Sequence, residues 1–277
     1  MSPIIPIEDL FEDIIAKSMR GRNISEGNLA ETTGVSPDVL HRLCRGEFCD
    51  EPALLKVAEA LSLDPRALTM SASKVWRPRP VELEGLEVLN TPYRDMRVNA
   101  FLVWDPDSKV GAAFDTGTDS TKLVDKAIGA GITIDTIFIT HTHNDHIADL
   151  DRLKTACGEV CVYSNEAEPW PETQSFSEGD SFSIGNLSIE TFTTSGHSVG
   201  GTTYYIEGLA KPVAVVGDAM FAGSMGGGMI SFADAWKNNQ EKILTLPDET
   251  VICPGHGPVT TVGEEKRNNP FFASEYR

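Results

Sequence analysis

The sequence predicts an α+β protein in which a small all-α domain precedes a larger domain of sheets covered by helices. Three observations support this. Residues 1–70 show helical periodicity and no strand-like alternation. Residues 71–80 are rich in Pro, Ser and Arg, which is typical of a linker. Residues 81–277 contain many apolar and β-branched runs with a few helical stretches between them. The 277 residues suffice for a domain of about 200 residues and a smaller one.

The first domain is predicted to contain four short helices and a final helical turn. An apolar stripe over residues 10–15 has helical spacing and predicts the first helix. The second helix starts near Ser25 and stops at Gly34, a residue type that favours helix ends. Further start signals are the pairs Ser36-Pro37, Glu51-Pro52 and Asp64-Pro65.

The segment from residue 22 to residue 70 resembles the Cro/repressor type of helix-turn-helix domain. The resemblance lies in a Leu-Ala pair, the sequence Thr-Gly-Val-Ser and a glycine that closes the third helix. It implies that the third helix enters a DNA major groove. The contact residues would be Asp38, His41, Arg42 and Arg45. Because residues 1–80 carry a net charge of −2, a module for dimerisation or docking is the alternative interpretation.

The second domain is predicted to be rich in strands. Helices are expected at about 120–130, 146–157 and 232–245. The strand-like runs are RVNAFLVW, KVGAAF, TIDTIFIT, EVCVYS, SFSIGNLSIETFTT, GTTYYIEG, PVAVVGDAMF and ETVICPG. Strands with a few interspersed helices predict sheets covered by helices rather than an all-β barrel.

Charge and cysteine content restrict the environment and the partners. The formal net charge is −18, of which −16 lies in residues 81–277, and such a surface repels the phosphate backbone of nucleic acids. No apolar run reaches the ~18 residues that a membrane-spanning helix needs, and the N-terminus lacks signal-peptide features. We therefore expect a cytoplasmic protein with free thiols at all five cysteines, namely Cys44, Cys49, Cys157, Cys161 and Cys253.

Histidines are concentrated in three short motifs that follow strand-like runs. The motifs are THTHNDH, SGHS and PGHGP, and they contain His141, His143, His146, His197 and His256. Imidazole is the commonest protein ligand for zinc-like ions, and carboxylates such as Asp145 can join it. Glycines next to His197, Asp218 and His256 leave room for the backbone to approach bound ions. The sixth histidine, His41, has no metal-type neighbours.

The ordered pattern HxHxDH, GH, GD and GHG resembles the metallo-β-lactamase superfamily, within its glyoxalase II-like branch. The resemblance covers residues ~85–277 and implies a four-layer αβ/βα sandwich with two divalent metal ions. It implies that the first metal is held by His141, His143 and His197 and the second by Asp145, His146 and His256, with Asp218 bridging both. Asp115 matches a supporting aspartate at a strand end.

The implied chemistry is hydrolysis by a metal-bound hydroxide, with Asp145 orienting the nucleophile or accepting its proton. Zinc is the expected metal, with iron and manganese as alternatives. The ending GEEKRNNPF is similar to that of short glyoxalase II-like enzymes and favours a small thioester substrate. Two departures from those enzymes concern glutathione recognition. A Gly-Arg-x-Asp element is absent after Asp218, and no extra helical domain follows.

Other functions remain open at this level. A lactonase would use the same seven ligands, whereas a persulfide dioxygenase would hold one iron through His141, His197 and Asp218. A phosphodiesterase is disfavoured by the acidic surface. A DNA-binding regulator with a metabolite-sensing metal domain is a further alternative, and helix-turn-helix modules of this kind often form homodimers. Residues 226–228, all glycine, suggest either a flexible loop over the cleft or a tight turn.

Overall fold

A computed structural model of the chain describes residues 5–48 and 50–276. Its N-terminal part is helical, and the strands begin after residue 85. The four predicted helices of this part are confirmed as α1 (Phe11–Gly21), α2 (Glu26–Thr33), α3 (Pro37–Leu43) and α4 (Glu51–Ala60). The predicted final turn is a full helix, α5 (Pro65–Ala72). Because α5 runs to Ala72, the first two residues of the predicted linker are helical instead.

Side-chain caps explain where the N-terminal helices begin. The Ser36 hydroxyl accepts from the Val39 N–H, and the Asp64 carboxylate accepts from the Ala67 N–H. Each cap satisfies one of the backbone N–H groups that the first turn leaves without a partner. Gly34 ends α2 in the left-handed conformation, as its residue type predicts.

The first sheet has six strands in sequence order and is mixed. Strands β1 to β3 pair antiparallel, and β3 to β6 pair parallel. The strands are β1 (Leu86–Tyr93), β2 (Met96–Trp104), β3 (Val110–Phe114), β4 (Thr133–Phe138), β5 (Cys161–Asn165) and β6 (Gln174–Phe176).

The second sheet also has six strands, in the order β14-β13-β10-β9-β8-β7. Only β10 and β13 pair parallel. The strands are β7 (Ser181–Ile184), β8 (Leu187–Thr193), β9 (Thr202–Glu207), β10 (Val213–Gly217), β13 (Val251–Pro254) and β14 (Thr260–Thr261). A separate short hairpin joins β11 (Met220–Phe221) to β12 (Ser224–Met225).

The remaining helices correct two sequence predictions. The helix expected over 146–157 is two helices, α7 (Asn144–Ile147) and α8 (Leu150–Cys157). The helix expected over 232–245 is α9 (Phe232–Asn238) followed by a π-helical turn, η1 (Asn239–Ile243). The chain ends with α10 (Val262–Asn268) and a 3₁₀ turn, η2 (Ala273–Tyr276). The expected helix over 120–130 is confirmed as α6 (Thr121–Ala130).

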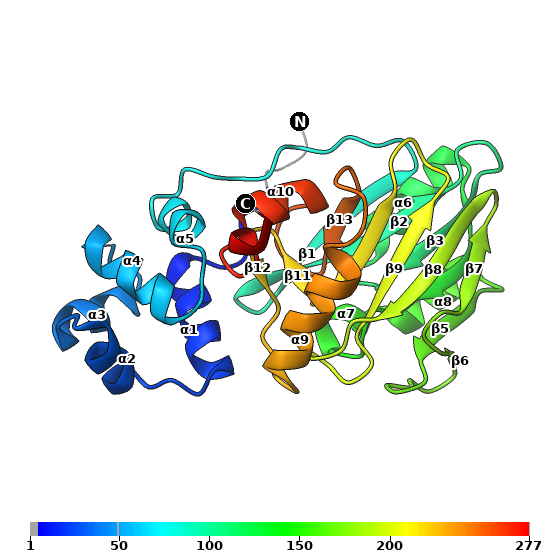
Figure 1. The fold of residues 1–277 in the computed structure, drawn as a ribbon. Coiled ribbons are helices and arrows are strands. Elements are labelled where there is room, and N and C mark those ends of the chain that lie inside the picture. Colours follow the sequence, from blue (N-terminus) through cyan, green and yellow to red (C-terminus); the bar gives the residue numbers. More distant parts are fainter. Residues whose placement is uncertain (1–4, 49, 277) are drawn as a thin grey trace.

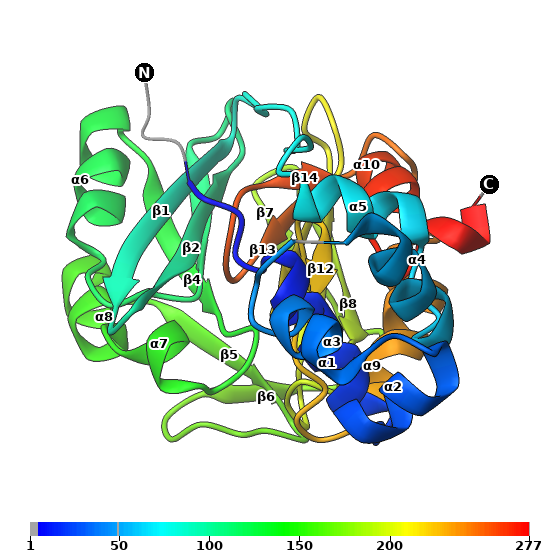
Figure 2. The same ribbon diagram turned by 90° about the vertical axis from the view of Figure 1, so that its left-hand side faces the viewer.

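The two sheets pack face to face between two layers of helices (Figures 1 and 2). Phe114 and Phe138 of the first sheet meet Tyr204 of the second in the apolar layer between them. On the outer face of the first sheet, α6 and α8 bury Leu123 and Leu153. Helix α9 covers the second sheet, and the N-terminal helices lie at one end of the molecule beside the hairpin β11–β12 (Figure 1). This is the α+β architecture predicted from the sequence.

The N-terminal helices share one apolar cluster with the second sheet and its hairpin. Phe11, Ile14 and Ile15 of α1 belong to the same cluster as Met220 and Met225 of the hairpin. The helical part therefore packs directly on the strand-rich part. In the described part of the chain, no helix combines the length and apolar character needed to cross a membrane. Cys44, Cys157, Cys161 and Cys253 are free thiols, and Cys49 lies outside the described residues.

Candidate metal centre

The predicted ligands converge because each follows the carboxyl end of a strand. His141, His143, Asp145 and His146 follow β4, and His197 follows β8. Asp218 follows β10 and His256 follows β13. In the second sheet β8, β10 and β13 run in the same direction, so their carboxyl ends lie at one edge. The structure brings all seven side chains together at that edge.

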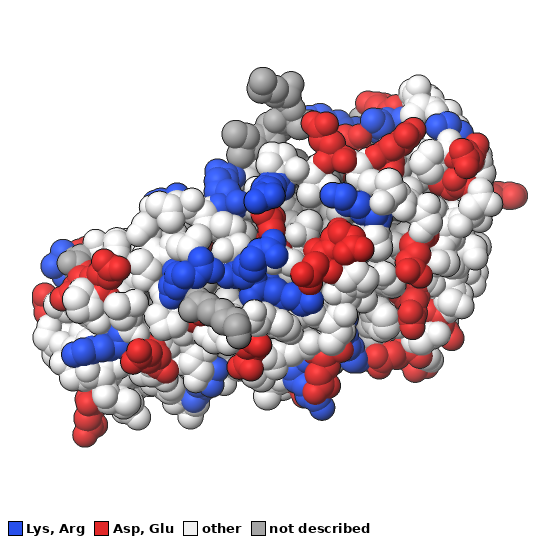
Figure 3. All heavy atoms as spheres, turned by 45° about the horizontal axis from the view of Figure 1, so that its top comes forward, with Lys and Arg blue, Asp and Glu red and all other residues white. Residues whose placement is uncertain are grey.

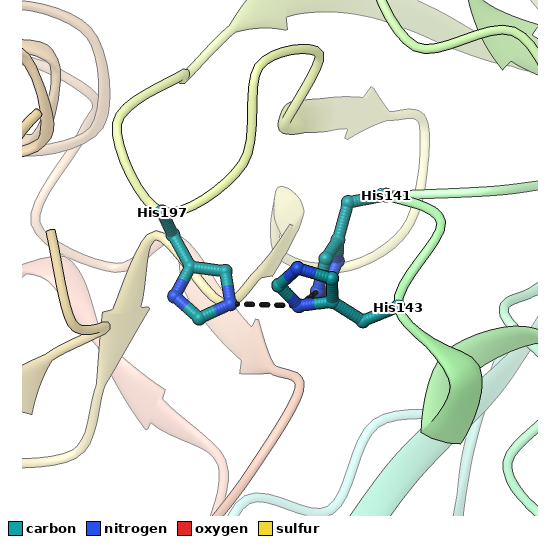
Figure 4. A group of neighbouring side chains, drawn as sticks. All are labelled: His141, His143 and His197. Atoms are coloured by element: carbon teal, nitrogen blue, oxygen red, sulfur yellow. Dashed lines mark hydrogen bonds between the residues drawn. The ribbon is translucent and has the colours of Figure 1, made fainter. Parts of the chain in front are cut away.

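Three histidines form one group of donors (Figure 4). The Nδ1 atom of His143 lies 3.1 Å from the Nε2 atom of His141 and 3.1 Å from the Nε2 atom of His197. Three nitrogen atoms that bind one zinc ion tetrahedrally would lie about 3.3 Å apart. The spacing of these nitrogens therefore fits a common cation.

A second group consists of Asp145, His146 and His256. The Oδ2 atom of Asp145 lies 3.7 Å from Nε2 of His146 and 3.3 Å from Nε2 of His256. His146 is completely buried and His256 nearly so. This group places one carboxylate and two imidazoles around a second point.

Asp218 lies between the two groups. Its Oδ2 atom is 3.3 Å from Nε2 of His197 and 3.4 Å from Nε2 of His256. Its Oδ1 atom is 3.4 Å from Nε2 of His146. Nε2 of His141 lies 4.0 Å from Oδ2. One carboxylate thus faces donors of both groups, which is the arrangement expected of a bridging ligand.

Asp115 orients two of the histidines, His146 directly and His141 through the Thr140 hydroxyl. The Nδ1–H of His146 donates to the Asp115 carboxylate at 2.7 Å. The Thr140 hydroxyl donates to the same carboxylate at 2.7 Å, and its oxygen lies 3.0 Å from Nδ1 of His141. With Nδ1 held in this way, each imidazole presents Nε2 to the centre. Asp115 has a φ of 58°, a left-handed conformation that a non-glycine residue adopts only when its surroundings enforce it.

Backbone carbonyls orient two further histidines. The Nδ1–H of His197 donates to the Gly227 carbonyl at 3.0 Å, and that of His256 donates to the Arg97 carbonyl at 2.6 Å. A Cβ added at Gly226 would lie 1.7 Å from the Asp218 carbonyl oxygen. The glycine segment over 226–228 therefore passes close to the centre, and its Gly227 carbonyl accepts from His197. At Gly226, glycine is required because the backbone approaches Asp218 too closely for a side chain.

The electrostatics of the centre favour positive charge between its carboxylates. Burial alone would favour the neutral form of Asp218, but His256, His146 and His197 hold its pKa well below the usual range. Burial lowers the pKa of His146, yet Asp115 and Asp218 raise it to about 10. The same carboxylate at Asp218, with Asp145, raises the pKa of His256 to about 11 against the effect of burial.

Two buried atoms at the centre have polar character and no hydrogen-bond partner in the described structure. They are Nε2 of His146 and Oδ1 of Asp218, which face each other at 3.4 Å. Buried polar atoms without a partner are costly unless a ligand satisfies them. A Cβ at Gly255 would lie 2.2 Å from Oδ1 of Asp218, so the backbone leaves no spare room there. These residues fit a metal site.

Glu168 is a residue that sequence analysis missed. Its Oε1 atom accepts from both the N–H and the hydroxyl of Thr142, at 2.7 Å each. Its Oε2 atom accepts from the Gly200 N–H at 2.8 Å. Glu168 thereby connects the loop that carries His141 and His143 to the loop that carries His197. It stands in the segment SNEAEPW, where no motif marks it.

The C-terminal motif GEEKRNNPF supports the hairpin that follows Asp218. The Glu265 carboxylate accepts from the Gly223 N–H at 2.9 Å and from the Thr260 hydroxyl at 2.7 Å. The Asn269 amide donates to the Ser224 carbonyl and to Glu265, both at 2.8 Å. These contacts hold the turn between β11 and β12 in place.

Comparisons with known proteins agree with this geometry. The family model described as "Metallo-beta-lactamase superfamily" matches residues 93–256. A probable metallo-hydrolase, YqgX of Bacillus subtilis, is 30% identical over 65% of this chain and 95% of its own length. Hydroxyacylglutathione hydrolase GloC of Haemophilus influenzae is 28% identical over 66% of this chain and 97% of its own. The solved structure of TTHA1623 in a di-iron-bound form superposes with a TM-score of 0.54 at 27% identity, covering 67% of this chain and all of that one.

Proposed function

The chain belongs to the metallo-beta-lactamase superfamily, and on that premise we propose that it is a dinuclear metallohydrolase that cleaves a small thioester or related ester. One observation carries this proposal. Two groups of donors flank Asp218, and that carboxylate lies within 3.4 Å of histidines from both. The family uses divalent metal ions, and a related structure holds two irons.

The first ion would be held by His141, His143 and His197, and the second by Asp145, His146 and His256, with Asp218 shared. We propose zinc, which accepts this mixture of imidazole and carboxylate, with iron or manganese as alternatives. When bound, such ions lower the pKa of water and polarise a carbonyl group, and this supplies the hydrolytic chemistry.

The protein's own side chains position the reactants and move the proton. Asp145 directs Oδ2 toward His146 and His256, which leaves Oδ1 to orient the attacking water and accept its proton. Asp115 and the Arg97 carbonyl keep the imidazoles of His146 and His256 in the tautomer that presents Nε2. The site is thereby assembled before the substrate arrives.

The substrate class is inferred from the relatives and from charge. GloC is named a hydroxyacylglutathione hydrolase and aligns over nearly its full length. A net charge of −18 opposes polymeric nucleic acid as a substrate. A small thioester is therefore the first substrate class to examine, with cyclic esters as the second.

Elemental analysis of the purified protein, paired with hydrolysis assays on thioester and lactone panels, tests the proposal. We expect two metal ions per chain and faster turnover of thioesters. A single iron together with oxygen consumption on a persulfide would replace this proposal with a dioxygenase. Two ions with lactone turnover alone would retain the metal centre and change the substrate class.

For the N-terminal helices we keep a DNA-contacting role for α3 as a hypothesis. Asp38, His41, Arg42 and Arg45 are all exposed, but His41 faces Glu26 and Arg42 pairs with Glu47. These carboxylates weaken an electrostatic attraction for phosphate. A gel-shift assay at low and high salt tests this hypothesis. A complex that forms at low salt and weakens at high salt would support contact with DNA phosphates, and no complex at low salt would reject it.

A further inference from the structure

A cavity of about 240 Å³ lies apart from the metal centre, between the N-terminal segment, α5, the start of the linker and the hairpin β11–β12. Much of its wall is apolar, formed by Ile7, Leu10, Ala67, Ala222 and Pro270. Trp76 also lines it, and the ring of this tryptophan lies against Gly223 at the hairpin turn, where an added Cβ would be 2.8 Å away. The cavity therefore has an aromatic and aliphatic interior.

Two exposed cations, Lys74 and Arg77, also line this cavity. Within residues 5–48 and 50–276, neither of them forms an ion pair with a carboxylate, and Arg77 donates to the Ile5 carbonyl. The one carboxylate in the lining, Asp9, is paired with Lys17. Figure 3 shows Lys and Arg side chains gathered over this face of a molecule whose net charge is −18. Among the described residues, the rim of the cavity thus carries two cations that no carboxylate neutralises and that can attract an anion.

The cavity is separate from the metal centre, although the same segment borders both. The backbone N and Cβ of Glu8 lie over Gly257, 3.3 and 3.4 Å from where a Cβ at that glycine would stand. Its neighbours Ile7 and Asp9 line the cavity instead. A molecule in the cavity would therefore lie behind the segment that borders His256, outside the place where the substrate reacts.

We propose that this cavity binds a small organic acid, with its apolar body against Trp76 and Leu10 and its carboxylate between Lys74 and Arg77. The guanidinium of Arg77 suits a carboxylate because both are planar and can form paired hydrogen bonds. The volume exceeds the roughly 150 Å³ of a cavity that holds benzene and is below the roughly 300 Å³ at which drug-sized pockets begin. An arylacetic acid or a short-chain fatty acid has this size and this division of charge. The proposal does not depend on the catalytic activity.

Titration calorimetry of the full chain with phenylacetate and with 2-phenylethanol tests the proposal. The two probes share an aromatic body and differ in charge. We expect phenylacetate to bind about tenfold more tightly, which corresponds to about 1.4 kcal/mol. Lys74→Ala and Arg77→Ala should each weaken phenylacetate binding several-fold, and Lys122→Ala, an exposed lysine on α6, serves as the matched control.

Three results would overturn the proposal. The first is the absence of phenylacetate binding at millimolar concentrations. The second is equal affinity for the acid and the alcohol, because it removes the role of the cations. The third is unchanged phenylacetate affinity in the double variant Lys74→Ala, Arg77→Ala, because the carboxylate would then be binding elsewhere, for example at the metal centre. Both substituted side chains are exposed, so loss of folding is not expected and thermal unfolding verifies it.

Discussion

Replacing Glu168 by glutamine should loosen one half of the metal centre while leaving the fold intact. Glu168 connects the Thr142 backbone and hydroxyl to the Gly200 backbone, and so joins two loops that carry histidines. Burial alone would raise the pKa of Glu168, but the hydrogen bonds from Thr142 and Gly200 hold it below its usual value. The carboxylate is therefore ionised at neutral pH and accepts from every donor around it.

The expected loss of stability follows from the hydrogen bonds that the Glu168 carboxylate accepts. A glutamine amide accepts only through its oxygen, so its NH₂ group must face an N–H of either Thr142 or Gly200. A hydrogen bond to a charged group contributes roughly 1.5–3 kcal/mol, and the partial exposure of Glu168 favours the lower end. We expect a loss of about 2 kcal/mol in the free energy of unfolding. Residues that orient metal ligands typically change metal affinity by about tenfold or more.

Urea unfolding and competition with a metal chelator measure the two effects separately. The weaker affinity should appear mainly at the ion held by His141, His143 and His197, because Thr142 stands between His141 and His143 and Gly200 lies on the loop that carries His197. The matched control is Glu166→Gln, an exposed glutamate two residues earlier. If Glu168→Gln matches this control in both stability and metal affinity, the connecting role assigned to Glu168 is wrong.

Three further predictions concern the metal centre and its support. His143→Ala should lower metal content and abolish hydrolysis with an unchanged circular dichroism spectrum, and full activity would contradict the assigned site. Gly255→Ala should cost about 2 kcal/mol and reduce metal content because its Cβ would lie 2.2 Å from Oδ1 of Asp218, whereas Gly227→Ala, with its nearest neighbour at 3.8 Å, should do neither. Burial raises the pKa of Glu265 from 4.5 to about 7, so the folded state favours its protonated form and stability falls as pH rises from about 4.5 through 7. Urea unfolding at pH 5 and 8 should show this loss, roughly 3 kcal/mol, in the wild type and not in Glu265→Gln.

Local signals in the sequence predicted most of the fold. Caps such as Ser36 and Asp64 and the left-handed Gly34 mark helix ends through short-range hydrogen bonds and backbone freedom, so nearby residues suffice to locate them. The short strands β6, β12 and β14 escaped detection because two or three residues carry no periodicity, and β11 was not separated from the predicted run PVAVVGDAMF. Strand β1 (Leu86–Tyr93) is also missing from the predicted runs. The break between α7 and α8 was also missed.

The candidate site was also predicted only in part: its ligands were predicted, and the groups that orient them were not. The histidine motifs at strand ends, together with the resemblance of the pattern HxHxDH, GH, GD and GHG to the metallo-β-lactamase superfamily, pointed to the seven side chains that the structure brings together. The partners that orient them could not be predicted, because they lie far away in the chain and often contribute only backbone. His256 donates to the carbonyl of Arg97, 159 positions away, and any residue type provides a carbonyl. Glu168 needs its loop to fold back onto Thr142 and Gly200 before its role is visible.

The linker at residues 73–80 joins two parts of the chain that pack against each other. Phe11, Ile14 and Ile15 belong to the same buried cluster as Met220 and Met225. YqgX and GloC align with this chain over 95% and 97% of their own lengths, so little of either chain is left for an equivalent helical part. Cutting this protein at the linker would expose thioether and aromatic surface beside the hairpin that follows Asp218, and the isolated fragment should self-associate in solution. Trimming the chain to match its relatives would therefore yield a less soluble molecule than the full-length chain.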